Sequence, residues 1–298
     1  MDQNNPFFKQ VELLVAVLPL LAQHNCFALK GGTAINLFVR DLPRLSVDID
    51  LAYLPIADRE RSLADIDSAL RALGLVIEQR IPATSVNYTV LSGTNYCIKL
   101  IVQQGSTAIK IEVTPVLRGC VYAPQQLSTQ SKVEALFGSA TVQCLSFYDL
   151  FGGKLCAALD RQHPQDLFDV MLLLQNEGLS RELIQAFMVY LIGHNRPMAE
   201  LLAPHRQDIT RAFEFEFNNM TSEAVSVDEL STAREAVIAA ISNTLTNDDK
   251  QFLLAVKSGA VDWSTFAFPE VEHLPAIQWK LFNLKGSSVK TVGKRAAL

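Results

Sequence analysis

Apolar residues recur at helical spacing at the start of the chain and predict a core helix over residues 6–23. A short apolar stretch at 26–29 then runs into two glycines, and residues 33–39 regain helical spacing. Alternating positions predict a strand over 47–53, and a single apolar face predicts a helix over 58–73. The chain therefore begins with mixed helices and strands.

The pattern changes after Leu75, where β-branched and aromatic residues cluster between turn signals such as Ser-Gly and Gln-Gly. These clusters predict adjacent strands over 86–91, 96–102 and 108–113. A loop region containing prolines follows, with one more short strand predicted over 141–145.

Beyond Ser146 the periodicity is almost entirely helical. It predicts helices over 148–159, 165–174, 181–192, 227–242 and 248–256. We therefore predict an α/β (α+β) domain over residues 1–145 and an all-helical domain over residues 146–298.

The composition is that of a folded chain. Of the 298 residues, 49% are hydrophobic and 19% are charged, which excludes disordered and fibrous classes. The five cysteines fit neither a disulfide framework nor a zinc site, so we expect reduced thiols and a cytoplasmic protein. The apolar run at 13–22 contains Pro19 and is too short to cross a membrane, and we expect no signal peptide.

The formal net charge of -5 argues against a surface coated with basic residues. The charge is unevenly distributed, however, because no acidic residue follows Glu272. The cations beyond it are Lys280, Lys285, Lys290, Lys294 and Arg295. Trp279 and Phe282 lie among them, so this segment either binds RNA phosphates or forms a solvated tail. Any RNA-binding surface must be local.

Two glycines and a threonine lie near the start of the most informative stretch, LKGGTAINLFVRDLPRLSVDIDLAY at residues 29–53. Gly31 and Gly32 have no Cβ, so the backbone can turn sharply and a phosphate can approach it closely. Thr33 then begins a predicted helix, whose first amides attract anions. This end of the stretch suits a nucleoside triphosphate.

Two aspartates lie near the other end. Asp48 and Asp50 are one residue apart in a predicted strand, so both carboxylates point to the same face. Such carboxylates repel each other unless a cation lies between them, and Mg²⁺ prefers one or two carboxylates together with substrate phosphates. Two ions about 3.5 to 4 Å apart could activate an attacking hydroxyl and stabilise a departing pyrophosphate. Just before the pair, Arg44 and Ser46 either contact the nucleotide or form the turn into the strand.

A third metal-binding carboxylate could come from Glu112, in the strand predicted over 108–113. Alternation places Glu112 and Lys110 on one face of that strand and apolar residues on the other. Any half-exposed strand shows the same alternation, so Glu112 is either a metal ligand or an ordinary surface residue.

Lys154 and Arg161 are seven residues apart on one face of a predicted helix. That face could clamp phosphates, or it could be an exposed charged surface. Asp166 and Asp169 follow Pro164, a helix-start signal, where the helix dipole favours carboxylates without any catalytic role. Asp166 could also orient Lys154 or Arg161 without touching a substrate.

The GGT and DID motifs together resemble the GG[S/T]…DxD signature of the DNA polymerase β nucleotidyltransferase superfamily. The segments LKGGTAINLF and RLSVDIDLAY are more closely similar to the AbiEii family, the MenT-like nucleotidyltransferase toxins of bacterial toxin-antitoxin pairs. The similarity continues in KLCAALDRQHPQDLFDV at residues 154–170 and in LPAIQWKLFNL near the end. It implies a polymerase-β-type core with a mixed sheet, followed by a helical domain. No GxxxxGK[ST] or GxGxxG motif supports a kinase, ATPase or dehydrogenase.

The resemblance implies that Gly32 and Thr33 contact the NTP phosphates, that the aspartate pair binds Mg²⁺ or Mn²⁺, and that Lys154 holds the triphosphate. Asp166 would be a later acidic residue of the catalytic set. The implied protein is an abortive-infection toxin of phage defence, which transfers NMP from an NTP to RNA at the tRNA 3′ end and blocks translation. Its implied partner is a cognate antitoxin. Two alternatives stay open, namely transfer to a protein hydroxyl and nucleotide binding by a regulatory module without turnover.

Overall fold

The computed structural model describes residues 6–284 and divides into two compact units. The first unit combines the chain up to Leu150 with Ile209–Glu229, and the second combines Phe151–Asp208 with the chain from Leu230 onwards. The sequence-based boundary after residue 145 lies close to the first division, whereas the return of Ile209–Glu229 to the first unit was not predicted. Across the described residues, no helix combines the length and apolar character that spanning a membrane requires.

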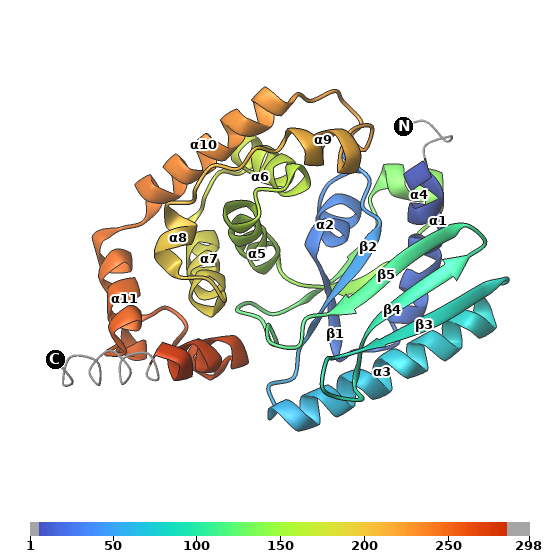
Figure 1. The fold of residues 1–298 in the computed structure, drawn as a ribbon, viewed down its shortest axis with the longest axis horizontal. Coiled ribbons are helices and arrows are strands. Elements are labelled where there is room, and N and C mark those ends of the chain that lie inside the picture. Colours follow the sequence, from blue (N-terminus) through green and yellow to red (C-terminus); the bar gives the residue numbers. More distant parts are fainter. Residues whose placement is uncertain (1–5, 285–298) are drawn as a thin grey trace. The chain divides into compact units, whose positions relative to one another are not determined.

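The first unit is built on a seven-stranded mixed sheet with the strand order β3-β4-β5-β2-β1-β7-β6 (Figure 1). Its strands are β1 (Phe27–Lys30), β2 (Asp48–Tyr53), β3 (Thr84–Val90), β4 (Cys97–Gln104), β5 (Thr107–Val113), β6 (Gln125–Ser128) and β7 (Thr141–Cys144). The β2–β5 and β1–β7 pairs are parallel, and the other neighbouring strands are antiparallel. The predicted mixed α/β fold is confirmed.

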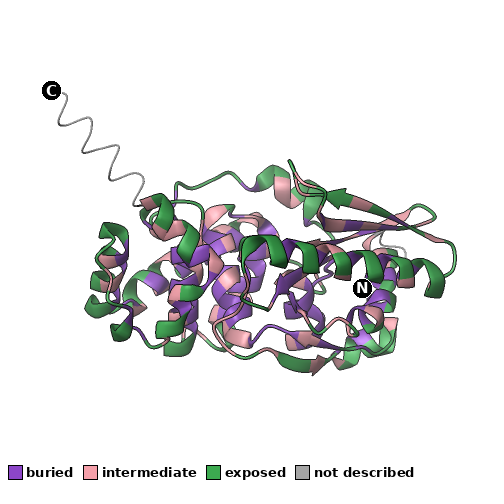
Figure 2. Ribbon diagram, turned by 90° about the horizontal axis from the view of Figure 1, so that it is seen from below, coloured by how far each residue is buried: buried purple, intermediate pink, exposed green. Residues whose placement is uncertain are grey.

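Two long helices, α1 (Pro6–Leu21) and α3 (Arg59–Arg80), lie along one face of this sheet (Figure 1). The Asp58 carboxylate caps α3 by accepting a hydrogen bond from the Arg61 backbone N–H. The helix extends beyond the predicted end at residue 73 because Ile77 continues its buried face. In Figure 2 the helices accordingly carry exposed residues on one side and buried residues on the other.

Two elements of the first unit were predicted as loop, and that prediction was wrong. They are β6 and α4 (Ser131–Phe137). β6 is a mostly exposed edge strand without apolar alternation, and within α4 only Val133 is buried. Neither segment therefore carries a clear hydrophobic period.

Helices dominate the described chain after Ser146, as predicted. They are α5 (Phe147–Asp160), α6 (Pro164–Asn176), α7 (Arg181–Gly193), α8 (Met198–Leu202), α9 (Thr210–Glu216), α10 (Val227–Thr244), α11 (Asn247–Ser258) and the 3₁₀ turns η2 (Trp263–Thr265) and η3 (Pro269–His273). Residues 275–284 are also helical. The tail cations Lys285, Lys290, Lys294 and Arg295 lie outside the described residues. All five cysteines are free thiols, as expected.

Candidate active site

The predicted aspartate pair lies on one face of β2, beside the parallel strand β5. Asp48 stands opposite Lys110 and Asp50 stands opposite Glu112. Ile49 is fully buried, whereas 46% of the Asp48 side chain is exposed. The alternation expected from the sequence is therefore present, and strand pairing adds two charged residues beside the aspartates.

Ion pairs connect charged side chains on the three strands β2, β5 and β4. The Lys110 Nζ lies 3.5 Å from Asp48 Oδ2 and 3.2 Å from Glu112 Oε2. The Lys99 Nζ, on β4, lies 3.2 Å from Glu112 Oε1. Within residues 6–284, the Asp50 carboxylate takes part in no hydrogen bond or ion pair. We call these five residues, Lys99, Lys110, Glu112, Asp48 and Asp50, the sheet cluster.

The pKa values of Asp48 and Glu112 are shifted in opposite directions. Burial raises the pKa of Asp48, and the charges of Asp50 and Glu112 raise it further against the opposing effect of Lys110. Burial alone would raise the pKa of Glu112 as well, but Lys110 and Lys99 outweigh it and lower that pKa. Burial is thus the main reason that ionisation of Asp48 is disfavoured, and a bound cation would offset that cost.

The two glycines of the motif are required by close contacts. Gly31 has φ +73, in the left-handed region, and a Cβ there would lie 2.7 Å from Asp50 Oδ2. At Gly32 a Cβ would lie 2.5 Å from Arg44 Nη2 and 2.9 Å from Ser46 Oγ. The glycines therefore leave room for the Asp50 carboxylate and for the side chains of Arg44 and Ser46.

Thr33 and Ser46, both predicted to contact nucleotide, are buried and contact each other. Their hydroxyl oxygens lie 3.0 Å apart, and the Thr33 hydroxyl also donates to the Asp48 carbonyl oxygen. Arg44 is 1% exposed, and its Nη1 donates to the Leu45 carbonyl oxygen at 2.9 Å. These side chains hold the start of β2 against α2 (Gly31–Ala34). This helix begins at the glycines rather than at Thr33, where it was predicted to begin, and it continues as a π-helix, η1 (Ile35–Val39).

The donor set of the aspartate pair fits a divalent cation. Both carboxylates lie on one half-exposed face of β2, and Asp50 has no protein partner within residues 6–284. Mg²⁺ commonly binds one or two protein carboxylates and completes its coordination shell with substrate phosphates and water, which this pair allows. The described residues contain no group of three or more His, Cys, Asp or Glu arranged to hold a metal ion. A pair of carboxylates suits an ion that arrives with substrate phosphates.

The second unit contains a different charged group, which we call the helix cluster: Lys154, Arg161, Asp166 and Asp169. The Lys154 Nζ lies 2.9 Å from Asp166 Oδ1 and 3.0 Å from Asp169 Oδ2. Arg161 approaches Asp166 with two nitrogens, Nε to Oδ2 at 2.5 Å and Nη2 to Oδ1 at 3.0 Å. Every predicted site residue of the second unit therefore belongs to one ion-pair network.

Burial separates the members of the helix cluster. Asp166 and Asp169 are 0% and 1% exposed, and Lys154 is 6% exposed, whereas 61% of the Arg161 side chain is exposed. Burial alone would raise the pKa of Asp166, but Lys154 and Arg161 hold it well below its usual range. Lys154 is therefore not part of an exposed charged face, and Arg161 is the accessible cation of the group.

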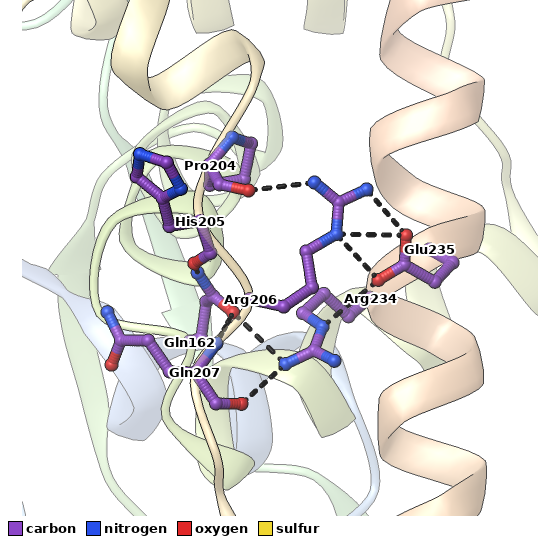
Figure 3. Close-up of polar contacts among 7 residues, drawn as sticks. All are labelled: Gln162, Pro204, His205, Arg206, Gln207, Arg234 and Glu235. Atoms are coloured by element: carbon purple, nitrogen blue, oxygen red, sulfur yellow. Dashed lines mark hydrogen bonds and ion pairs between the residues drawn. The ribbon is translucent and has the colours of Figure 1, made fainter.

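Gln162, the residue after Arg161, fixes the turn that follows α5, and Figure 3 draws the contacts of its side chain. Gln162 has φ 49 and is 1% exposed, its amide donates to the His205 carbonyl oxygen at 2.7 Å, and its Oε1 accepts from Gln207 and Arg234 at 3.0 and 3.1 Å. Arg234 in turn contacts Glu235. The amide thus fixes the connection between α5 and α6 beside the helix cluster.

Lys99, Lys110 and Gln162 are the site-adjacent residues that sequence reasoning did not select. The strand alternation already placed Lys110 on the face of Glu112, which was the available signal. Its position beside Asp48 depends on the parallel pairing of β2 with β5, and local patterns do not specify such pairing.

Comparisons with known proteins agree with the resemblance inferred from the motifs. The family model of the nucleotidyl transferase AbiEii toxins, of type IV toxin-antitoxin systems, matches residues 12–283. The solved structure of MenT4, a nucleotidyltransferase toxin from Mycobacterium tuberculosis H37Rv, superposes with a TM-score of 0.62 over 93% of both chains at 15% sequence identity, and so shares the fold. No curated protein matched. The chain belongs to the AbiEii family of nucleotidyltransferase toxins of type IV toxin-antitoxin systems.

Proposed function

We propose that this nucleotidyltransferase moves an NMP group from an NTP to a hydroxyl of RNA, at the tRNA 3′ end, with Mg²⁺ or Mn²⁺ held by Asp48 and Asp50. The observation that carries the proposal is the half-exposed pair of carboxylates beside the glycine turn, in a chain whose family is that of nucleotidyltransferase toxins. Modification of the tRNA acceptor end would block translation.

In the proposed reaction the acceptor hydroxyl oxygen bonds to the α-phosphorus of the NTP. The bond from that phosphorus to the bridging oxygen breaks, pyrophosphate leaves, and the hydroxyl proton passes to solvent. A bound divalent ion would polarise the phosphoryl oxygens. Asp48 and Asp50 would hold that ion, and the backbone N–H groups that follow Gly31 would donate hydrogen bonds to the phosphate oxygens. Positioning and charge supply most of the catalysis, as is usual for phosphoryl transfer.

In the second unit, Arg161 is the residue that we propose for direct contact with the triphosphate. Its side chain is 61% exposed, and a guanidinium suits phosphate oxygens. Lys154, predicted for that contact, contributes through Asp166, because this carboxylate binds both cations. Asp166 is in this proposal a positioning residue.

The choice of RNA as acceptor rests on the carboxy-terminal region. The chain has no acidic residue after Glu272, and five cations follow. Trp279 and Phe282, on the helix at 275–284, are 59% and 70% exposed, with ring centroids 6.0 Å apart. Exposed aromatic rings among cations are typical of surfaces that stack on single-stranded bases. Lys280 anchors the helix by donating to the carbonyl oxygens of His194 and Arg196.

A labelling experiment tests this function. Purified protein is incubated with Mg²⁺, cell lysate and each of the four α-labelled NTPs, and the products are digested with RNase or with protease. We expect label that RNase removes and that maps to the tRNA 3′ end. Label that protease alone removes would show a protein acceptor, and the absence of label with every NTP would contradict the proposal.

The family also implies an antitoxin partner. We propose that this partner and the tRNA substrate meet the toxin in the cytoplasm. Co-expression with the gene encoded beside the toxin gene should restore growth to cells that this protein arrests.

A further inference from the structure

The sheet cluster places a lysine where a metal site of three carboxylates would need open space. Lys110 projects from β5 between Asp48 and Glu112, with its ammonium 3.5 Å from the first and 3.2 Å from the second. The other oxygen of Glu112 lies 3.2 Å from Lys99. Both oxygens of the predicted third ligand are therefore engaged by lysines.

We propose that Lys110 supplies a permanent positive charge inside the metal-binding site. Glu112 positions Lys110 and is not a third metal ligand. This inference rests on the proposed function, because it assumes that Asp48 and Asp50 bind a divalent ion. Lys110 contacts one oxygen of Asp48, Oδ2, so the other oxygen of Asp48 and the Asp50 carboxylate are left for the divalent ion.

The contacts of Asp50 and Glu112 support the assignment of Asp50, and not Glu112, as a metal ligand. Asp50, opposite Glu112 in the strand register, has no hydrogen bond or ion pair within residues 6–284. Glu112 has a lysine partner on each oxygen, so a metal ion bound to Glu112 would have to share those oxygens with two cations that repel it. Lys110 also offsets the repulsion among three neighbouring carboxylates, so the site can assemble before any ion binds.

The competition between Lys110 and the metal ion for Asp48 has a measurable consequence. Two cations close to one carboxylate repel each other, by an amount that depends on the local dielectric. Removing the Lys110 charge should therefore tighten metal binding. Lys99 is the matched comparison, because it contacts Glu112 at the same 3.2 Å but forms no ion pair with Asp48 among the described residues.

Binding of Mn²⁺ to the full chain without nucleotide, followed by the electron paramagnetic resonance signal of free Mn²⁺, tests the inference. We expect Lys110→Met to bind Mn²⁺ at least about threefold more tightly than wild type, and Lys99→Met to gain less. The decisive variant is Lys110→Met/Glu112→Gln, which removes the pair without changing the net charge. Its dissociation constant should stay within about threefold of wild type, because no ligand is lost.

A control variant of unchanged net charge measures how much Mn²⁺ affinity is lost when a proposed metal ligand is removed. Lys99→Met/Asp50→Asn also leaves the net charge unchanged, and we expect it to lose Mn²⁺ binding at least about tenfold. Circular dichroism checks that each variant is folded. A tenfold or greater loss in Lys110→Met/Glu112→Gln, or equal gains in the two single lysine variants, would overturn the inference. Absence of Mn²⁺ binding to wild type would overturn it together with the proposed metal dependence, whereas normal Mn²⁺ binding without transfer would contradict the proposed function alone.

Discussion

The sheet cluster and the helix cluster contain the same kinds of charged groups but differ in burial. In the sheet cluster, 46% of the Asp48 side chain is exposed, and Asp50 forms no hydrogen bond or ion pair within residues 6–284. In the helix cluster, Asp166 is 0% exposed and is held by Lys154 and Arg161. Charges that remain accessible can bind a ligand, whereas buried paired charges hold structure and are costly to disturb. The first cluster is therefore suited to chemistry and the second to positioning.

The largest effect that we expect is loss of stability on breaking the helix cluster. Asp166→Asn leaves the buried Lys154 with one partner fewer, and removal of one partner from a buried pair costs about 3–5 kcal/mol. The free energy of unfolding, from urea denaturation, measures this loss. Asp248→Asn, at an exposed position in the first turn of α11, is the control and should change little. A loss below about 1 kcal/mol for Asp166→Asn would show that the buried network is dispensable for folding.

The next effect is on activity, in the other cluster. Asp50→Asn removes a proposed metal ligand from a half-exposed strand face, so we expect nucleotide transfer to fall about a hundredfold or more. The free energy of unfolding should stay near the wild-type value, because the Asp50 side chain makes no hydrogen bond or ion pair within residues 6–284 that would be lost. Transfer of label from NTP measures the effect, with Glu60→Gln on α3 as a control of equal charge change. Full activity in Asp50→Asn would remove the basis for separating a chemical cluster from a structural one.

Local patterns predicted the accessible cluster better than the buried one. Asp48 and Asp50 share a face because strand residues alternate, and the six residues of β2 alone contain that information. The expected face of Lys154 and Arg161 depended on helical spacing alone. Burial of Lys154 follows from Asp166 and Asp169 on α6, so it is a consequence of helix packing that periodicity does not describe. Lys110 was missed as a neighbour of Asp48 for a similar reason, since strand order is set by tertiary structure.

A smaller effect concerns pH. The pKa of Asp166 is depressed in the folded protein, so its ionisation stabilises the fold above the ordinary aspartate pKa of 3.8. That contribution is lost as the pH falls below 3.8 and through the depressed value. The difference in unfolding free energy between wild type and Asp166→Asn should therefore shrink on acidification below about pH 4. Urea denaturation between pH 3 and 7 measures it, and a difference that does not depend on pH would contradict the assignment of Asp166 as ionised in the fold.

The smallest expected change in stability belongs to Arg161, the exposed member of the helix cluster. Arg161→Gln should lower the free energy of unfolding by only about 0.2–1 kcal/mol, because 61% of the side chain is exposed and Asp166 keeps its contact with Lys154. If Arg161 contacts the triphosphate, the same variant should raise the KM for NTP about tenfold, equivalent to about 1.4 kcal/mol of binding. Arg206→Gln is the control, since Arg206 also forms an exposed ion pair in the second unit, with Glu235. A change in stability without a change in KM would make Arg161 a purely structural partner of Asp166, and the helix cluster would then contribute no direct contact to the nucleotide.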